Sequence, residues 1–278
     1  MVRRARLDAE LVRRGLARSR EQAAQLITDG RVKVAGTRAL KAATGVGPDT
    51  PVTVRAVTDT PDYVSRGAHK LAGALAVFGR AMPPLTVDGK TCLDAGASTG
   101  GFTDVLLRAG AARVAAVDVG YGQLAWPLRQ DPRVEVLERT NVRSLTPDQI
   151  GGRAALTVAD LSFIGLRVVL PALAACTAPD GDLVLLVKPQ FEVGREQLGE
   201  GGVVREPDLR AAAVIAVAKA ARELRLQVRG VVASSLPGPS GNVEYCLWLA
   251  GHAAIAPEPQ EEQALDAAVA RAVREGPT

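Results

Sequence analysis

Residues 91–102 read TCLDAGASTGGF and carry the strongest fold signal in this chain of 278 residues. An apolar run there leads into a glycine-rich loop and then into residues of helical character. Six further apolar runs follow, separated by segments of helical character: 113–119, 133–138, 155–162, 182–189, 226–234 and 242–251. Strands that alternate with helices build a doubly wound, mostly parallel sheet. We therefore predict an α/β fold with a seven-stranded Rossmann-like sheet.

The loop after the first predicted strand indicates a nucleoside cofactor. Its glycines let the backbone approach a ligand, and a helix N-terminus follows. The spacing Asp-x-Gly-x-x-x-Gly-Gly departs from the GxGxxG of dinucleotide sites and is closer to loops that hold S-adenosylmethionine; NAD is the alternative. Asp118 ends the second strand, where a carboxylate accepts hydrogen bonds from ribose hydroxyls. The predicted cofactor-binding residues are Asp94, Gly96, Ala97, Ser98, Thr99, Gly100, Gly101, Phe102, Asp118, Asn141 and Asp160.

Asn141 has two interpretations, an adenine contact or an ordinary turn residue. The segment 190–206 is glycine-rich and is expected to be either a mobile loop over an RNA groove or a plain surface loop. Tyr121 and Trp126 are expected to stack on a base or to pack in the core.

Four charged residues stand in or beside runs that otherwise appear buried. Asp160 and Lys188 end predicted strands, Glu244 lies in the last strand, and Lys70 lies on a helix before the sheet. Buried charges are rare unless they are paired. The four therefore form either a structural salt-bridge square or the charged centre of an active site, and ionisable groups in a cleft favour the second.

The charge of the chain is concentrated at its N-terminus. Residues 1–58 hold twelve of the 34 Arg and Lys residues and five of the 30 acidic ones, a net charge of +7, and the remainder carries −3. This asymmetry indicates a polyanion-binding module, although solvated helix charges are the plainer alternative. Arginine suits phosphate because its planar fork donates two parallel hydrogen bonds.

The N-terminal residues also show helical and strand patterns. Leu7, Leu11 and Val12 have helical spacing, and Ser19 is an expected N-cap with Gln22 as its capping-box partner. Gly30 is expected to follow the second helix, before the short strand RVKV and a turn at Ala35-Gly36. We predict four segments: an RNA-binding module at 1–58, a linker at 59–63, a catalytic domain at 64–252 and a helical tail at 253–278.

Composition excludes several classes of protein. The three cysteines lie far apart without a CxxC pair, so a disulfide scaffold and a structural zinc site are not expected. The basic start lacks an apolar signal-peptide core, and residues 154–178 indicate a buried strand and helix rather than a membrane span. We expect a cytoplasmic monomer with no metal, no membrane association and no obligate protein partner. His69 is not expected to bind metal, and Cys92 and Cys246 are expected core residues.

The N-terminal strings RLD (6–8), LVRRGLARSR (11–20) and LITDGRVKVAG (26–36) resemble the S4 RNA-binding domain. Ala35 departs from the usual asparagine before the turn glycine. The resemblance implies phosphate contacts with structured RNA. The residues expected to make them are Arg3, Arg4, Arg6, Arg14, Arg18, Arg20 and Lys33.

Lys70, Asp160, Lys188 and Glu244 match the Lys-Asp-Lys-Glu tetrad of FtsJ-like ribose 2′-O-methyltransferases. Longer strings, SRGAHKL (65–71), VKPQFEVGRE (187–196) and GPSGNVEY (238–245), are similar to the TlyA family. The resemblance implies S-adenosylmethionine as cofactor and methylation of cytidine 2′-hydroxyls in 16S and 23S ribosomal RNA within ribosomal subunits. It also implies a link to sensitivity to capreomycin-type antibiotics. The alternatives are a non-catalytic ribosome-assembly binder and a membrane-active haemolysin.

The resemblance makes the tetrad the catalytic group, with Lys188 as the candidate base. Lys188 can accept a proton only when it is neutral; desolvation and Lys70 favour the neutral amine, whereas the carboxylates favour the ammonium form. We expect Asp160 to orient Lys188 and the donor methyl, Glu244 to contact Lys188 or the ribose, and Lys70 to hold the target. Alternatively, charged lysines stabilise the developing alkoxide.

Overall fold

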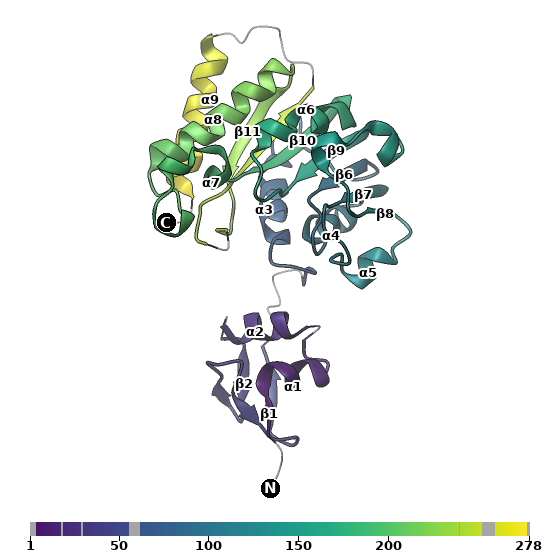
Figure 1. Ribbon diagram of the computed structural model, residues 1–278, viewed down its shortest axis with the longest axis vertical. Helices are drawn as coiled ribbons and strands as arrows, with labels where there is room; N and C mark the ends of the chain where they lie inside the picture. Colours follow the sequence, from purple (N-terminus) through teal and green to yellow (C-terminus); the bar gives the residue numbers. More distant parts are fainter. Residues whose placement is uncertain are drawn as a thin grey trace. The chain divides into compact units, whose positions relative to one another are not determined.

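The computed structural model describes residues 4–17, 19–28, 30–55, 62–238, 240–251 and 259–276. The chain forms two compact units, Met1–Asp62 and Tyr63–Thr278 (Figure 1). Most of the predicted linker 59–63 lies outside the described residues, as do Arg3 and Arg18. No helix within the described ranges is long and apolar enough to cross a membrane.

The N-terminal unit joins two helices to two small sheets. Its core contains Leu7 and Leu11, which lie at the predicted helical spacing, and Val12 packs against it. The strands form a three-stranded sheet β3-β2-β5 and a pair β1-β4. The elements are β1 (Ala5–Arg6), α1 (Leu7–Arg13), α2 (Arg20–Thr28), β2 (Val32–Val34), β3 (Thr37–Arg38), β4 (Gly45–Val46) and β5 (Val52–Val54).

The predicted N-cap of α2 and the predicted turn glycines of this unit are confirmed. The Ser19 hydroxyl accepts a hydrogen bond from the Gln22 amide at 3.1 Å, so Ser19 caps α2. Gly30 adopts a left-handed conformation just after the helix. Ala35 and Gly36 both have positive φ, 48° and 82°, which is the conformation of a tight hairpin turn between β2 and β3. Alanine is strained there, whereas the family's asparagine tolerates that conformation.

Two acidic side chains of α1 are buried by arginine partners. Asp8 accepts hydrogen bonds from Arg6 and Arg20, each at 3.0 Å, and Glu10 pairs with Arg13 and Arg14. The arginines lower the pKa of both carboxyl groups to about 2. Their charged forms therefore stabilise the folded unit above the ordinary carboxyl pKa near 4.

We expect this unit to lose stability as the pH falls from about 4 to about 2, because the two carboxylates become protonated over that range. Pepsin cleavage within residues 4–55 of the full chain, followed by mass spectrometry, measures this loss. The double variant Asp8→Asn/Glu10→Gln should be cleaved readily already at the upper end of the range. Asp49→Asn, at an exposed acidic residue, is the control. Equal cleavage of wild type and double variant at every pH would contradict the assignment.

The C-terminal unit is built on one seven-stranded sheet with the order β11-β12-β10-β9-β6-β7-β8. All strands run in one direction except β12, which is antiparallel to both neighbours. This confirms the predicted α/β class and the seven strands. The strands are β6 (Thr91–Ala95), β7 (Arg113–Val117), β8 (Val134–Leu137), β9 (Ala154–Ala159), β10 (Thr177–Val187), β11 (Gln227–Ala233) and β12 (Tyr245–Ala250).

Helices cover both faces of this sheet (Figure 1). Residues of α6, α8 and α9 pack with one face, and residues of α3, α4 and α5 pack with the other. The α-helices are α3 (Ala68–Phe78), α4 (Gly101–Arg108), α5 (Trp126–Arg129), α6 (Leu166–Cys176), α7 (Pro189–Glu192), α8 (Pro207–Glu223) and α9 (Pro259–Glu275). Short 3₁₀ turns are Val142–Ser144, Pro147–Ile150, Arg195–Gln197 and Glu200–Gly202.

Two predictions about helices are settled. Residues 154–178 form strand β9 and helix α6, as expected for a buried strand–helix pair. The predicted helical tail contains α9, and its residues Leu265, Val269 and Ala272 join the core beside β11 and α8. Residues 252–258, between β12 and this helix, lie outside the described part of the chain.

The strand order places the site. From β6 the chain proceeds through β7 and β8 on one side and returns to β9 and β10 on the other. The order therefore reverses between β6 and β9, and ligands of such sheets bind outside the carboxyl ends of the strands at this point. Gly96 follows β6 and Asp160 follows β9, so both predicted site segments lie at the reversal.

Candidate active site

The loop after β6 is shaped by its glycines. Gly96 and Gly100 have φ angles of 86° and 95°, in the left-handed region. A Cβ on Gly96 would lie 2.6 Å from the Asp160 carbonyl oxygen, and one on Gly101 would lie 3.0 Å from the Ala68 amide nitrogen. Only glycine allows this loop to lie against both the end of β9 and the start of α3.

Asp118 organises a small pocket beside this loop. Its carboxylate accepts hydrogen bonds from the backbone amides of Ser98 at 2.8 Å and Gly120 at 2.6 Å. The Ser98 hydroxyl lies 3.3 Å from the Gln123 side-chain oxygen, a contact that the sequence did not suggest. The pocket is lined by Ala97, Ser98, Ala116, Asp118, Gly120, Gln123, Leu124, Val136 and Glu138. Backbone amides, a carboxylate and apolar walls suit a nucleoside.

The other predicted cofactor residues divide by exposure. Ser98 and Thr99 are exposed and Gly96 is partly exposed, so these can touch a ligand. Asp94, Ala97, Gly100, Gly101 and Phe102 are buried beneath them.

Asp94 supports the loop from below. It is fully buried and accepts a hydrogen bond from the Thr103 hydroxyl at 2.6 Å. Burial raises its pKa to about 7, and the nearby carboxylates of Asp160 and Asp118 add to the rise. Asp94 therefore supports the start of α4 through Thr103, and its contact with a cofactor stays a prediction.

Asn141 lies close to Asp118 but is engaged locally. Its side-chain oxygen accepts a hydrogen bond from the Arg143 amide at 3.0 Å and caps a 3₁₀ turn, which is the behaviour of a turn residue. The neighbouring Thr140 amide donates to the Asp118 carbonyl. Asn141 is not among the residues that line the pocket, and an adenine contact stays a prediction.

The close packing of Gly96 gives a direct test. We expect Gly96→Ala to weaken S-adenosylmethionine binding by about tenfold or more, because the added Cβ displaces the loop from Asp160. Gly89→Ala is the matched control, since Gly89 has φ +70° but nothing within 4 Å of the position of a Cβ. Calorimetric titration measures both affinities. Equal affinities would show that the contact between this loop and Asp160 does not shape the pocket.

The four tetrad residues come from four different elements. Lys70 lies on α3, Asp160 and Lys188 follow β9 and β10, and Glu244 precedes β12. Each of the last three lies two residues from a strand residue that packs on the α3 side of the sheet; those residues are Val158, Leu186 and Cys246. Because side chains alternate along a strand, all three charged groups are directed to the face that carries Lys70.

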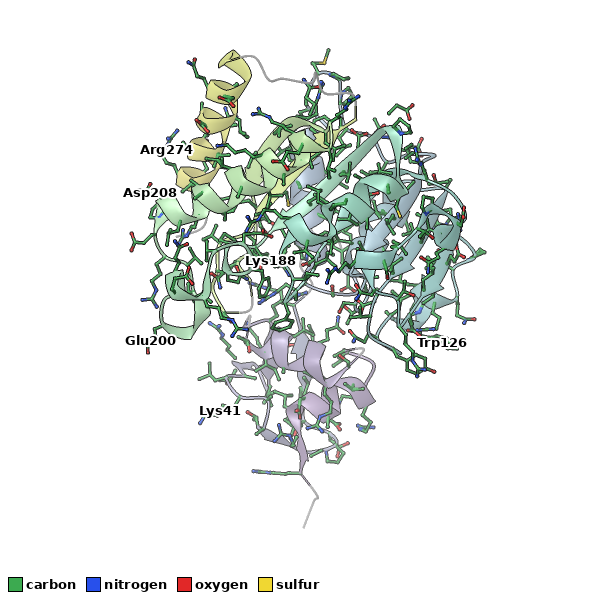
Figure 2. All side chains as sticks on the ribbon, turned by 45° about the horizontal axis from the view of Figure 1, so that its top comes forward. Lys41, Trp126, Lys188, Glu200, Asp208 and Arg274 are labelled. Atoms are coloured by element: carbon green, nitrogen blue, oxygen red, sulfur yellow. The ribbon has the colours of Figure 1, made fainter. Side chains whose placement is uncertain are left out.

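The tetrad forms two ion pairs. The Lys188 Nζ atom lies 2.6 Å from Asp160 Oδ1, and the Lys70 Nζ atom donates to Glu244 Oε2 at 2.5 Å. Of the two contacts expected for Glu244, the one with Lys188 is wrong, because α3 brings Lys70 to Glu244, and the one with the ribose stays a prediction. Lys70, Lys188 and Glu244 are less than 10% exposed, and Asp160 is partly exposed. Figure 2 shows Lys188 in the interior of the unit.

Two residues outside the predicted set of site residues, Ser162 and Phe191, lie beside Lys188. The Ser162 hydroxyl accepts a hydrogen bond from Lys188 Nζ at 3.0 Å. Phe163 follows with φ 65°, a strained conformation for an aromatic residue, and is 92% exposed. Its ring packs on Phe191, with 5.5 Å between centroids. An exposed ring beside a buried lysine offers a stacking surface for a nucleobase.

Hydrogen bonds hold the segment 190–206 at both of its ends. The buried Glu192 carboxylate accepts hydrogen bonds from the Leu166 amide at 2.5 Å and from Arg167. Desolvation raises the pKa of Glu192. At the other end the Asn242 side chain accepts from the Val204 amide and donates to the Gly202 carbonyl. Helix α7 ends at the first of these anchors, Glu192, and the two 3₁₀ turns Arg195–Gln197 and Glu200–Gly202 follow it.

The structure also places the other residues that the sequence analysis singled out. Tyr121 and Trp126 are both 69% exposed, so core packing was the wrong alternative; Trp126 projects from the surface, away from Lys188 (Figure 2). The Arg139 guanidinium lies 4.5 Å from the Tyr121 ring centroid. His69 packs edge-on against Tyr63. Cys92 and Cys246 are buried in the core. The described residues contain no cluster of side chains that could hold a metal ion.

The predicted RNA-binding residues of the N-terminal unit differ in availability. Arg4, Arg6, Arg20 and Lys33 are exposed. Arg14 donates to the carbonyl oxygens of Thr50, Gly47 and Pro48 and to Glu10. These four hydrogen bonds hold the loop before β5, so Arg14 has a structural role in the unit, and its phosphate contact stays a prediction.

Known proteins share this architecture. The FtsJ-like methyltransferase family matches residues 63–250, and the S4 domain matches residues 5–52. The 16S/23S rRNA (cytidine-2′-O)-methyltransferase TlyA of Mycobacterium tuberculosis is 61% identical over 283 aligned positions, which cover 100% of both chains. YqxC of Bacillus subtilis, described as a candidate rRNA methyltransferase, is 44% identical over 88% of this chain and 85% of the relative.

A solved structure of a candidate hemolysin from Streptococcus thermophilus is similar to the whole chain. It matches with a TM-score of 0.74 and 38% identity, and the match covers 99% of this chain and 98% of the other. The family match spans most of the C-terminal unit, and the relatives extend it through the N-terminal unit. The chain therefore belongs to the FtsJ-like methyltransferases that carry an N-terminal S4 domain, the family that includes TlyA.

Proposed function

We propose that this chain transfers a methyl group from S-adenosylmethionine to the 2′-hydroxyl of cytidines in ribosomal RNA. One observation carries the proposal: the ion pairs Lys70–Glu244 and Lys188–Asp160 lie at the end of the sheet that carries the Gly96 loop, where the strand order reverses. The relative TlyA is named for this reaction and is 61% identical over its whole length.

The residues of the pocket fit the cofactor. Asp118 lies where ribose hydroxyls can donate to it, and Ser98 and Thr99 are exposed on the glycine-rich loop. When bound, S-adenosylmethionine supplies an electrophilic methyl group on a positively charged sulfur. The chain must then supply alignment and removal of a proton from the 2′-hydroxyl.

The two ion pairs divide this work. Lys188, held by Asp160 and Ser162, accepts the proton of the 2′-hydroxyl. Lys70, held by Glu244, contacts the ribose or phosphate of the target nucleotide. Asp160 also borders the Gly96 loop, so it links the base to the cofactor pocket.

We assign the segments accordingly. Residues 1–58 bind RNA, residues 64–252 bind the cofactor and carry out the reaction, and α9 supports the catalytic domain. Arg4, Arg6, Arg20 and Lys33 are exposed in the N-terminal unit, and Arg3 and Arg18 belong to the same basic segment. These cations are proposed to contact backbone phosphates of ribosomal RNA.

Methyl transfer to isolated ribosomal subunits tests the proposal. Wild-type protein, labelled S-adenosylmethionine and separate small and large subunits are incubated, and the RNA is then hydrolysed with alkali. A 2′-O-methyl group blocks cleavage at the labelled nucleotide, so resistance to alkali identifies both the chemistry and the position. No label on either subunit from a folded protein that binds the cofactor would favour the binding-only assembly factor.

The basic N-terminal unit makes RNA affinity depend on salt. We expect the affinity for the ribosomal subunit that serves as substrate to fall about 10²- to 10³-fold between about 50 and about 200 mM salt. Each protein cation that binds a phosphate releases counterions from the RNA. Lys33→Gln should reduce the slope of log affinity against log salt by about one, whereas Lys219→Gln, at an exposed residue of α8, should leave it unchanged. Filter binding at several salt concentrations measures the slope. An unchanged slope in Lys33→Gln would remove Lys33 from the RNA contacts.

A further inference from the structure

Ser162 is the hydrogen-bonding partner of the candidate base. Its hydroxyl accepts from Lys188 Nζ at 3.0 Å. The contact between Lys188 and Asp160 is shorter, 2.6 Å, but it lacks hydrogen-bond alignment, and Asp160 Oδ1 finds no hydrogen-bond partner among the described residues. Asp160 therefore supplies charge, whereas Ser162 supplies direction.

Ser162 also lies at the boundary between the buried site and solvent. Lys188 is only 7% exposed, whereas Ser162 is an exposed residue. A hydroxyl group can accept one hydrogen bond while it donates another. Ser162 can therefore accept from the buried amine and donate to solvent at the same time.

The position of Ser162 is fixed by contacts between two segments. One segment, 160–166, carries Ser162 and Phe163; the other, 188–193, carries Lys188, Phe191 and Glu192. Phe163 packs on Phe191, and Glu192 accepts a hydrogen bond from the Leu166 amide. Both contacts are made by residues that follow Ser162 in the chain. They hold the Ser162 hydroxyl at Lys188 although Ser162 itself is exposed.

We infer that Ser162 is a positioning residue that directs the Lys188 amine and conducts its proton to solvent. The inference rests on the proposed function, in which Lys188 is the base. In the transfer, the 2′-O–H bond breaks, its proton forms a new N–H bond on Lys188, and the oxygen electron pair bonds the methyl carbon as the carbon–sulfur bond breaks. The ammonium group then gives a proton to the Ser162 oxygen while the Ser162 hydroxyl proton passes to water, which restores both groups.

Methyl transfer over repeated turnovers tests this role, because Lys188 must lose the proton that it has accepted before it can act again. Wild type, Ser162→Ala and Ser162→Thr are compared on the same ribosomal subunit from about pH 6 to about pH 10. Ser235→Ala is the matched control, because Ser235 is also exposed and its hydroxyl donates to a backbone carbonyl, that of His69. Cofactor affinity and thermal unfolding are measured for each protein.

We expect Ser162→Ala to slow transfer about 10- to 100-fold near neutral pH. The loss should shrink at high pH, because hydroxide there takes the proton from the Lys188 ammonium group without the serine. Ser162→Thr keeps the hydroxyl and should restore the rate to within about threefold of wild type. Cofactor affinity should stay within about twofold, because the pocket at Asp118 is unchanged. Ser235→Ala should behave as wild type.

Three results would overturn the inference. Equal rates for wild type and Ser162→Ala at all pH values would show that Ser162 does not act on Lys188. An equal loss at every pH, without recovery in Ser162→Thr, would show a merely structural role. If wild type itself transfers no methyl group to either subunit, the proposed function fails and the inference falls with it, whereas transfer by wild type separates the two questions.

Discussion

Lys188→Ala should abolish methyl transfer while cofactor binding persists. We expect the single-turnover rate to fall about 10³-fold or more, because the variant lacks the group that accepts the 2′-hydroxyl proton. Cofactor affinity should change by no more than about threefold, since Ser98, Asp118 and Gly120 make the pocket without Lys188. Labelled methyl transfer and calorimetric titration measure the two quantities on the same preparation.

The control for this variant is Lys219→Ala, which removes an exposed lysine of α8 and should retain wild-type activity. Removing Lys188 also leaves the Asp160 carboxylate without its ion-pair partner, so some loss of thermal stability is expected. A loss of cofactor binding in parallel with activity would mean that Lys188 holds the pocket together and is not the base.

Lys188→Arg distinguishes the two roles that the sequence leaves open for Lys188, a neutral base and a charged group that stabilises the alkoxide. Arginine keeps the positive charge but does not lose its proton in proteins, so it cannot act as a base. If Lys188 accepts the proton, Lys188→Arg should be as inactive as Lys188→Ala. If charged lysines only stabilise the developing alkoxide, Lys188→Arg should keep a substantial part of the wild-type rate.

The tetrad could be identified from sequence because its members break strong local patterns. Asp160 and Lys188 each end an apolar run, and Glu244 stands in one, so their positions at strand ends follow from the strand pattern itself. The seven strands were predictable for the same reason. Alternation along a strand then fixes the face on which these side chains lie.

The partners within the site were not predictable from sequence. Glu244 pairs with Lys70, 174 residues away in the chain, because of where α3 packs on the sheet. Ser162 and Phe163 lie in a string that continues a strand pattern, and only the contacts with 188–193 reveal their roles. Arginine is a common phosphate ligand, yet the Arg14 guanidinium donates hydrogen bonds to three backbone carbonyl oxygens. These features depend on tertiary contacts that local patterns do not encode.

The second large effect concerns α9, which follows the part of the chain matched by the FtsJ-like family. Val269 is 1% exposed and packs with Leu265 and Ala272 in the core between α8, α9 and the sheet. We expect Val269→Asp to destabilise the C-terminal unit by about 3–5 kcal/mol, because it buries a charge without a partner. For a domain of this size the midpoint of thermal unfolding should fall by roughly 6–20 °C.

Tryptophan fluorescence measures this change in the right unit, because both tryptophans, Trp126 and Trp248, lie in the C-terminal unit. Ala270→Asp is the matched control, since it adds the same charge to the exposed side of the same helix at the next position. α9 packs on β11, and β11 pairs with β12, whose first residue follows Glu244. A much lower unfolding midpoint for Val269→Asp than for Ala270→Asp would therefore show that α9 belongs to the scaffold that holds the tetrad. Equal midpoints would show that the packing of α9 does not stabilise the unit.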